Sequence, residues 1–497
     1  MAIALVAVVL LAVGDGAARA QSGWSLRSST EIADGASLQE WGHSDPVEAL
    51  AVEVDPSAGM RVGAVLSGDR VDGGRETVSS MCRRVGAVAC VNANFAVCSG
   101  CAHPFGGVVI DGRLVRSPTP GQDDLSVIDG RLSVDRWPWS VRVEAAGEAL
   151  ELDGVNLGPV ADAIVVHTRD FGPTTSAAAD VHEVVIIAPQ GLRTGPDHRQ
   201  RITFGPQSGG GATSLSADTM VLTGLGAGAE RLRSFVDRHE GEAVEIVADT
   251  PSGLEHAVSG HPILLRDGVT LALDQADGKV AGRHPRTLVG WNDEGRIWIV
   301  VVDGRRSTSR GLTLASATEY LRELGATNAV NLDGGGSSAL VAPCPTSTDL
   351  CVRNQPSDGR ERPITVALAL YGEGIARPAS TVPAPVPTTV PAPVTTPTTT
   401  APIPTAAVPT TTVAPTSTTT STTTTIAPTT TTTSTTVPLP PRTISGPSEP
   451  VVTELAAAPA AGEGIDPRLV PALVAHTLVM VEVAALGRLR RRRSPER

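Results

Sequence analysis

Residues 282–341 read GRHPRTLVGWNDEGRIWIVVVDGRRSTSRGLTLASATEYLRELGATNAVNLDGGGSSALV, and this stretch decides the fold. Within it, residues 297–302 (IWIVVV) form a continuous apolar run rich in β-branched side chains, which is typical of a central strand covered on both faces. The turn-forming residues 292–295 (NDEG) precede this run. We therefore predict a β-hairpin made of residues 286–291 and 296–302.

A helix and a second strand are predicted after the hairpin. The apolar residues of 314–324 fall at helical spacing, with Thr313 available as the N-cap and Gly325 as the stop. The chain then returns in a strand at residues 329–332. Strand, helix and strand together predict a βαβ-like crossover.

Polar residues gather where this second strand ends. Asp333 follows the strand, and the glycine run 334–336 and Ser337 come directly after it. Glycine lets a backbone approach a ligand closely, and successive N–H groups can form an anion-binding concavity. Three glycines are also typical of a simple tight turn. The neighbouring carboxyl and hydroxyl groups, together with Arg286 and Arg310 in the same unit, favour a ligand site.

Further segments, in series along the chain, carry a recognisable pattern. They are VNANF at 91–95, PFGGVVIDG at 104–112, SGHPILLRDG at 259–268, the segments GRHPRTLVG, VVVDGR, SRGLTL and NLDGGGSSALV within 282–341, and the tail at 354–368. Over residues 88–372 this series resembles the phosphodiester glycosidase family. The resemblance implies a hydrolase that cleaves the bond between a sugar C1 and a phosphodiester oxygen, releasing the sugar and a phosphomonoester.

The resemblance also implies catalytic residues. Positive charge that develops at C1 calls for a carboxylate, acting as nucleophile or as base toward water. Asp333 is the first candidate and Asp303 the second, although an Asp-Gly pair after a strand is also typical of a turn. The departing phosphate calls for positive charge, and the planar guanidinium of Arg286 matches it, although a surface salt bridge is an equal alternative for any one arginine.

Substrate binding is expected from a wider set of residues. Asn92 and Asn94 follow a predicted strand and can bind sugar hydroxyls, although asparagine is equally common as a turn cap. Main-chain N–H groups and further polar side chains are expected to support the sugar or the phosphate; these are Thr287, Arg310, Gly334, Gly335, Gly336, Ser337, Asn354 and Arg362.

One position departs from the family pattern. Many relatives have an acidic residue where this chain has Ser316, and Glu319 does not replace it, because it lies away from the apolar face of the predicted helix. The departure leaves the acid and base roles open. It also permits an alternative function, a module that binds glycan and phosphate without turnover.

The cysteines indicate an exported protein with disulfides. The chain has six, an even number: Cys82, Cys90, Cys98, Cys101, Cys344 and Cys351. Cys344 and Cys351 form the easiest local pair. A redox pair or half of a zinc site is an alternative for Cys98 and Cys101, but no second CxxC exists and the segment lies in a Gly/Pro loop, so we interpret all six as structural. No metal site is predicted. The sequence requires no cofactor and leaves the need for a divalent cation open.

The head of the protein is predicted to be α+β, dominated by mixed β-sheet with few helices. Residues 1–20 read as a signal peptide, and residues 21–92 as an accessory lead-in to the head. Turn signals separate apolar runs at hairpin-like spacing. These runs predict strands at 49–54, 61–66, 85–91, 107–110, 126–134, 163–167, 181–188 and 243–248.

The C-terminal quarter differs in composition. Residues 378–441 contain no charged residue and consist almost entirely of Thr, Pro, Ala and Val, which is typical of a disordered, extended stalk. Residues 469–487 are mostly apolar and precede a basic tail at 488–497, which predicts a transmembrane helix with a cytoplasmic end. A surface helix or a partner-binding tail is the alternative.

Charge and anchoring together define the expected partners. The net charge of −12 argues against nucleic acid as a partner. We expect an exported protein, anchored in a membrane by its C-terminal helix, whose head lies outside the cell and acts on a glycan or sugar-phosphate. A structural protein in which the stalk matters more than the head is a third possibility.

Overall fold

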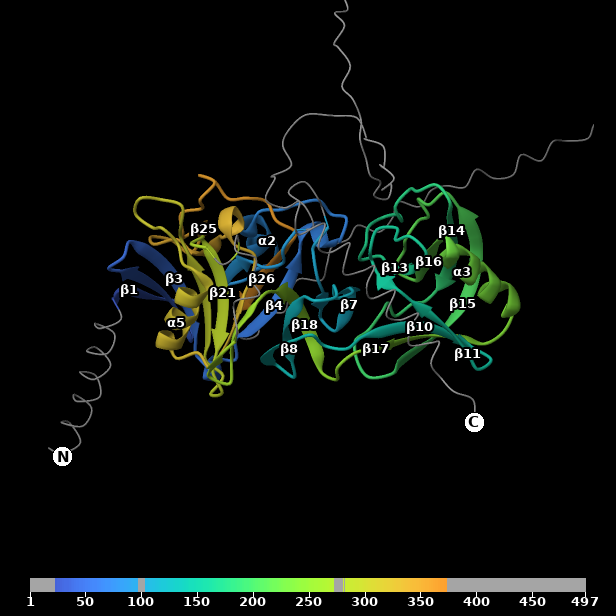
Figure 1. The fold of residues 1–497 in the computed structure, drawn as a ribbon, viewed down its shortest axis with the longest axis horizontal. Helices are drawn as coiled ribbons and strands as arrows, with labels where there is room; N and C mark the ends of the chain where they lie inside the picture. The colour runs from blue at the N-terminus through green and yellow to red at the C-terminus, as the bar shows by residue number, and fades with distance from the viewer. Residues whose placement is uncertain (1–22, 97–102, 272–279, 281, 373–497) are drawn as a thin grey trace, which may run out of the picture. The chain divides into compact units, whose positions relative to one another are not determined.

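The computed structural model describes residues 23–96, 103–271, 280 and 282–372 (Figure 1). The predicted signal peptide, stalk, transmembrane helix and basic tail lie outside these residues, as do Cys98 and Cys101. Within the described ranges the fold is dominated by β-sheet and has three α-helices, α2 (Val78–Val85), α3 (Ala227–Arg238) and α5 (Leu314–Leu324). The predicted sheet-dominated α+β head is confirmed.

The first sheet has eight strands and contains the predicted hairpin at its centre. Its order is β1 (Trp24–Ala33), β2 (Ala36–His43), β3 (Val47–Val54), β22 (Ile297–Val302), β21 (Arg286–Trp291), β23 (Asn328–Asn331), β19 (Ile263–Arg266) and β20 (Val269–Thr270). β22 and β23 both pair antiparallel with β21, so they are parallel to each other. The predicted crossover through α5 is therefore confirmed.

Local sequence explains why α5 begins and ends where it does. The Thr313 side chain accepts a hydrogen bond from the N–H of Ser316, and Gly325 closes the helix in the left-handed conformation. The apolar face of α5 packs on the side of the first sheet that carries Leu288 and Val300. Each such buried aliphatic side chain contributes about 1.5–3 kcal/mol.

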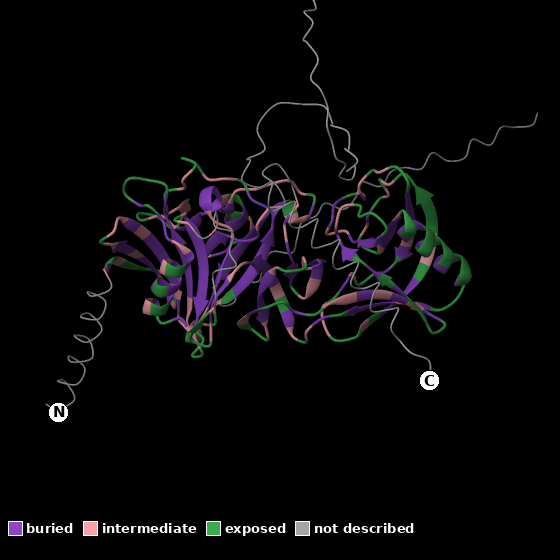
Figure 2. Cartoon of the chain, viewed as in Figure 1, coloured by how far each residue is buried: buried purple, intermediate pink, exposed green. Residues whose placement is uncertain are grey.

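The opposite face of the first sheet shares a core with a second sheet. This second sheet has the order β25 (Leu350–Val352), β24 (Leu340–Pro343), β5 (Ala89–Asn92), β26 (Val366–Tyr371) and β4 (Arg61–Leu66). Val289 and Val301 of the first sheet lie in one apolar cluster with Val91 and Leu368 of the second. The central strand β21 is buried along its whole length (Figure 2).

Two further sheets complete the described fold. The third has the order β7 (Arg113–Arg116), β6 (Val108–Ile110), β18 (Leu254–Gly260), β8 (Asp123–Ile128) and β9 (Arg131–Asp135). The fourth is built from the residues between β9 and β18, and we call it the inserted sheet. Its order is β11 (Glu148–Leu152), β10 (Ser140–Ala145), β17 (Val244–Asp249), β15 (His198–Gly209), β14 (Val181–Ile187), β16 (Thr219–Leu225), β13 (Ile164–His167) and β12 (Gly154–Val155). Helix α3 packs on β16 and β14 (Figure 1).

Three predictions of local structure need correction. Val85 ends α2 and Gly86 adopts the left-handed conformation, so the predicted strand at 85–91 begins only at Ala89. The predicted strand at 126–134 is a hairpin, because Asp129 and Gly130 turn the chain between β8 and β9. The residues set apart as a lead-in, 21–92, supply strands to both the first and the second sheet, since β3 pairs with β22 and β4 with β26.

The described cysteines include one disulfide, between Cys82 of α2 and Cys90 of β5. Cys344 and Cys351, the predicted local pair, are thiols in this structure. Cys351 lies on β25, Cys344 directly follows the paired strand β24, and their side chains are in hydrogen-bond contact. In the described part of the chain, no helix combines the length and the apolar composition that crossing a bilayer needs.

Candidate active site around Asp333

Asp333 lies where the first and second sheets meet, just beyond the end of β23. Its N–H donates to the carbonyl of Ala93 at 2.9 Å, and its own carbonyl accepts from the Asn92 side chain at 2.6 Å. The preceding residue, Leu332, donates its N–H to the Thr287 carbonyl at 2.8 Å. The main chain that carries the carboxyl is therefore held by strands of both sheets.

The Asp333 carboxyl receives two hydrogen bonds within its own turn. The Gly334 N–H donates to Oδ1 at 2.9 Å, and the Ser337 hydroxyl donates to Oδ2. Burial of the carboxyl nevertheless raises the pKa of Asp333 to about 6, although these hydrogen bonds and nearby arginines act in the opposite direction. The residue as a whole is half-buried. Asp333 can thus change its protonation state close to neutral pH, as an acid or base at an active site must.

Three arginines surround this turn. The charges of Arg362 and Arg75 both lower the pKa of Asp333, and each of these side chains is half-buried. Burial and the charge of Arg362 lower the pKa of Arg75. Arg305 lies against Gly335, since a Cβ placed on that glycine would be 3.0 Å from the Arg305 Nη2. We call Arg75, Arg305 and Arg362 the arginine cluster.

The arginine cluster was only partly predicted from the sequence. Arg362 was a candidate, whereas Arg75 and Arg305 were not. Arg305 directly follows the VVVDG segment, so its position after a central strand was a signal that could have identified it. Arg75 lies in a Gly-rich loop, and only the tertiary fold brings it to Asp333.

The glycine run is required by close protein contacts. A Cβ on Gly336 would overlap the Arg362 guanidinium and the Asp358 carboxylate, which form an ion pair at 2.6 Å. A Cβ on Gly334 would lie 2.8 Å from the Pro285 carbonyl oxygen. The N–H of Gly334 binds the Asp333 carboxyl, and that of Gly335 binds the Pro285 carbonyl at 2.9 Å. Two of the three N–H groups expected to bind an anion thus have protein acceptors here.

Arg286 does not direct its guanidinium to Asp333 in the way the sequence analysis expected. The side chain is buried on the α5 side of β21, where Nε donates to the Leu312 carbonyl at 3.0 Å. Nη2 donates to the carbonyls of Val280 and Gly282, at 2.5 and 2.7 Å. Burial, and then the charge of Arg305, lower the pKa of Arg286 to about 10. These contacts fix the loops beside the turn, and a catalytic role for Arg286 stays a prediction.

The asparagines expected to bind sugar are buried and join strands. Asn92 Oδ1 accepts from the Thr287 hydroxyl at 2.7 Å and from the Ala339 N–H at 3.1 Å. Asn94 donates to the carbonyls of Phe105 and Gly107, at 3.0 and 3.1 Å, and accepts from the Ser259 N–H. These side chains, like that of Thr287, position the strand ends around Asp333. Direct contact with a sugar stays a prediction for all three.

Asp303 and Asn354 form a second buried link to the turn. Both Asp303 oxygens accept from the Gln355 N–H, at 3.1 and 3.0 Å, and Oδ1 also accepts from Asn354 Nδ2 at 3.0 Å. Asn354 in turn donates to the Ser338 carbonyl at 3.1 Å. Burial raises the pKa of Asp303. Asp303 therefore holds the 354–355 segment, and its role as second carboxylate stays a prediction.

The remaining predicted residues lie in simpler surroundings. Arg310 is exposed and its Nη1 is 3.4 Å from Asp45 Oδ1. Ser316 hydrogen bonds to Thr313 at the start of α5, and Glu319 pairs with Arg322 at 2.8 Å on the exposed face of that helix. Ser316 thus contributes to the N-terminal cap of α5, and Glu319 to its solvent-facing side.

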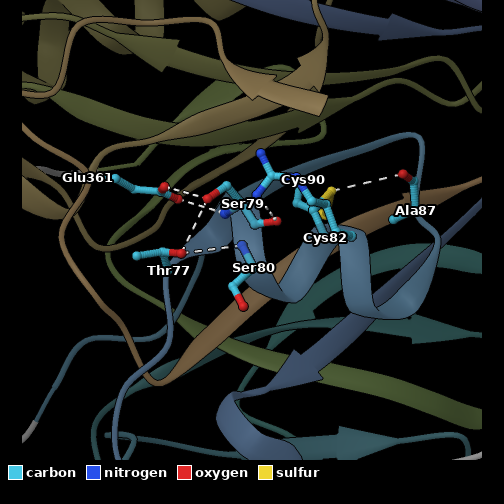
Figure 3. Close-up of a disulfide and its surroundings, with 8 residues drawn as sticks. Thr77, Ser79, Ser80, Cys82, Ala87, Cys90 and Glu361 are labelled. Atoms are coloured by element: carbon cyan, nitrogen blue, oxygen red, sulfur yellow. Dashed lines mark hydrogen bonds between the residues drawn. A yellow bond between two sulfur atoms is a disulfide. The ribbon is translucent and has the colours of Figure 1, made fainter. Parts of the chain in front are cut away.

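Contacts with Glu361 and with β5 hold helix α2 in place (Figure 3). The Glu361 carboxylate accepts hydrogen bonds from the N–H and the hydroxyl of Ser79, at 2.6 and 2.7 Å. The Cys82–Cys90 disulfide joins the same helix to β5. A two-way backbone bridge links Glu76 to Ile364. Arg75 directly precedes Glu76, and Arg362 directly follows Glu361. We therefore infer that these contacts around α2 position both arginines.

The described residues contain no group of three or more His, Cys, Asp or Glu side chains arranged to hold a metal ion. His284 contacts the arginine cluster, since its Nδ1 lies 3.4 Å from Arg305 Nη2. The Asp333 site thus combines the Asp333 carboxyl with three guanidinium groups, one of which, that of Arg362, also pairs with the Asp358 carboxylate. Such a site is suited to an anionic substrate at which positive charge develops.

Comparison with known proteins agrees with this geometry. A family model described as phosphodiester glycosidase matches residues 206–371. The mouse N-acetylglucosamine-1-phosphodiester alpha-N-acetylglucosaminidase is 45% identical over 56 residues, which are 11% of this chain and 11% of the mouse protein. An uncharacterized SPbeta prophage protein of Bacillus subtilis strain 168 is 35% identical over 88 residues, or 18% of this chain and 13% of that protein. The chain thus matches a small part of either curated relative.

Two solved structures share the fold. A hypothetical protein from Synechocystis superposes with a TM-score of 0.56 at 18% identity, covering 70% of this chain and 64% of its own. A protein from Burkholderia pseudomallei K96243 described as exported superposes with a TM-score of 0.51 at 23% identity, covering 67% of this chain and 74% of its own. The family model includes Asp333 and Arg362, so over residues 206–371, about a third of the chain, this protein resembles the phosphodiester glycosidase family.

Proposed function

We propose that this protein hydrolyses the bond between a sugar C1 and a phosphodiester oxygen, and that Asp333 and the arginine cluster carry out the reaction. One observation carries the proposal: a carboxyl with a pKa of about 6 lies within the electrostatic reach of Arg75 and Arg362, on a turn that Arg305 also contacts. The match of residues 206–371 to the phosphodiester glycosidase model supports the hydrolytic class of the reaction.

The arginine cluster is suited to the phosphate. Guanidinium groups bind phosphate oxygens through paired N–H donors, and positive charge stabilises the oxygen that departs from C1. A phosphodiester is already a good leaving group, so stabilising its charge matters more than protonating it. In the overall reaction the C1–O bond breaks, a water oxygen bonds to C1, and the released proton passes to the carboxylate or the solvent.

Asp333 is suited to the sugar side of the bond. Its carboxylate stabilises the positive charge that develops at C1, and it acts either as nucleophile or as base toward water. Both roles require the ionised form. The Ser337 and Gly334 hydrogen bonds favour that form against the effect of burial.

The full-length protein and a defined substrate test the proposal. The name of the mouse relative suggests the methyl diester of N-acetylglucosamine-1-phosphate as the first substrate. We expect release of free sugar and methyl phosphate by the wild-type protein and none above background by Asp333→Asn. Asp293→Asn, an exposed carboxylate in the β21–β22 turn, is the matched control and should retain activity.

The outcomes separate this proposal from its alternative. Tight binding of the diester by the wild-type protein without release of sugar would indicate a glycan- and phosphate-binding module, which the Ser316 departure permits. Release that persists undiminished in Asp333→Asn would contradict the assignment of the carboxylate.

The composition of the chain ends supports a surface location for this activity. Residues 1–20 and 469–497 have the patterns of a signal peptide and of a membrane anchor followed by a basic tail. A tethered head would act on glycopolymers outside the cell. Recovery of the full-length protein in the membrane fraction, and its release by truncation after residue 441, is the expected result. Recovery in the soluble fraction would contradict tethering.

A further inference from the structure

A cavity of about 400 Å³ lies where β7 meets loops of the inserted sheet. Backbone hydrogen bonds join the two parts of its wall, from the Leu114 N–H to the Leu192 carbonyl and from the Thr194 N–H to the Gly112 carbonyl, both at 2.9 Å. The volume is within the range of small-molecule binding sites and is large enough for one sugar-phosphate unit.

Charged side chains of both signs line this cavity. Arg113 forms an ion pair with Asp170. Arg193 Nη1 donates to a main-chain oxygen, that of Asp111, at 3.1 Å, and Arg169 is half-buried. Within the described ranges, neither Arg169 nor Arg193 forms an ion pair with a carboxylate. Two guanidinium groups in the wall are thus available to an anion.

The acidic residues in the wall limit what kind of anion fits. Asp111 and Asp218 also line the cavity, and Asp111 Oδ1 is 3.6 Å from His256 Nε2. Carboxylates would repel a ligand that is anionic on every side, but they accept hydrogen bonds from hydroxyl groups. A ligand with one phosphate and several hydroxyls satisfies both the arginines and the aspartates. A sugar-phosphate has that composition.

The cavity wall is connected directly to the Asp333 site. The Val71 N–H donates to the carbonyl of the lining residue Asp170 at 2.7 Å, and the Asp72 N–H donates to the Phe171 carbonyl at 2.8 Å. Four residues further along is Arg75, whose charge acts on Asp333. Four residue steps span at most about 14 Å. One short loop thus separates the cavity from the arginine cluster.

We propose that this cavity is a second subsite that binds another sugar-phosphate unit of the same substrate, with Arg169 and Arg193 holding its phosphate. The inference rests on the proposed function and extends it, because it makes the substrate a polymer of sugar-phosphate repeats rather than a single diester. A polymer that engages both sites binds more tightly than a single unit, since the second contact is intramolecular.

The test compares two substrates and two variants of the full-length protein. The substrates are the methyl diester of N-acetylglucosamine-1-phosphate and an oligomer of three N-acetylglucosamine-1-phosphate repeats. In the double variant Arg169→Gln/Arg193→Gln we expect the KM for the oligomer to rise by about 10- to 100-fold, the loss typical of a charged contact. The KM for the monomeric diester should stay within about twofold. Arg131→Gln, an exposed arginine of β9 outside this cavity, is the matched control and should change neither.

Binding measurements make failure of the subsite distinguishable from failure of the proposed reaction. Calorimetric titration of the oligomer into the Asp333→Asn protein, with and without the double substitution, needs no turnover. Weaker binding in the double variant supports the subsite even if the wild-type protein cleaves neither substrate. Equal oligomer binding with and without the double substitution, or an equal rise in KM for both substrates, would overturn it.

Discussion

Glu361 binds Ser79 through both carboxylate oxygens, at 2.6 and 2.7 Å, and so holds the segment that carries Arg362 at the N-terminus of α2. Arg362 then lies against Gly336, beside Asp333. The contact joins residues 282 positions apart. The contact supports the arginine cluster from outside the Asp333 turn.

Glu361→Gln should therefore weaken substrate binding more than turnover. The amide keeps one oxygen acceptor but replaces the other with an NH₂ group, which cannot accept a hydrogen bond from Ser79. The segment that carries residue 361 should therefore shift and carry Arg362 with it. We expect KM for the monomeric diester to rise by about 3- to 30-fold, with kcat changed less. Glu294→Gln, in the exposed β21–β22 turn, is the control. Unchanged KM in Glu361→Gln would show that the contact serves stability alone.

Ser337→Ala should move the pH dependence of the reaction. The Ser337 hydroxyl donates to the Asp333 carboxylate and lowers its pKa, so its removal should raise that pKa above about 6. Because the ionised carboxylate is the active form, the acidic limb of kcat/KM should shift to higher pH, by about 0.5–1 unit. Ser338→Ala, which removes a buried hydroxyl without a described partner, should leave the limb in place. An acidic limb identical in both variants would argue against Asp333 as the titrating group.

Asn92→Ala should destabilise the head strongly. The side chain satisfies the Asp333 carbonyl, the Ala339 N–H and the Thr287 hydroxyl, and it is buried. Leaving buried partners without hydrogen bonds costs about 1–3 kcal/mol each, so a loss of about 3 kcal/mol or more is expected. Denaturant unfolding measures it. Asn292→Ala, in a surface turn, should cost about 1 kcal/mol or less. Similar losses of unfolding free energy in the two variants would contradict the role of Asn92 in joining the strands.

These side chains also show how far the sequence predicts the site. The hairpin, α5 and Asp333 follow from local signals: a β-branched run, an N-cap at Thr313 and a glycine stop. Asn92 was predicted as part of the site, but its role as a link between strands depends on the pairing of two sheets. That pairing is a long-range property that one strand's sequence does not contain.

Arg286 shows what strand geometry adds to the sequence analysis. Side chains alternate between the two faces of a strand, so Arg286 and Thr287 cannot point to the same place. The structure puts Thr287 toward Asn92 and Arg286 toward α5. Helix α2 was equally recognisable, since Val78, Met81, Cys82 and Val85 are spaced as one helical face before Gly86. No comparable sequence pattern places Arg75 at the site.

Asp124→Asn should change how stability depends on pH. Asp124 is fully buried, and burial raises its pKa from 3.8 to about 7. Between these values the folded state holds a proton that the unfolded state has lost, so this residue lowers the free energy of unfolding as pH rises from 4 to 7, by up to about 4 kcal/mol. Asp124→Asn removes that loss. The free energy of unfolding of the variant, minus that of the wild type, should therefore increase from pH 5 to pH 8. Asp293→Asn, an exposed control, should show no such trend; a flat difference for Asp124→Asn would contradict the prediction.

The arginine cluster tests the central claim most directly, because three residues from separate loops are assigned one task. The measurement is kcat/KM for the monomeric diester in Arg75→Gln, Arg305→Gln and Arg362→Gln, with Arg131→Gln as control. We predict that each cluster variant loses about 10²- to 10³-fold, as expected for a group that stabilises the departing phosphate, and that the control stays within about twofold. If all three variants keep kcat/KM within threefold of wild type, the phosphate is not bound at Asp333 and the proposed active site is wrong.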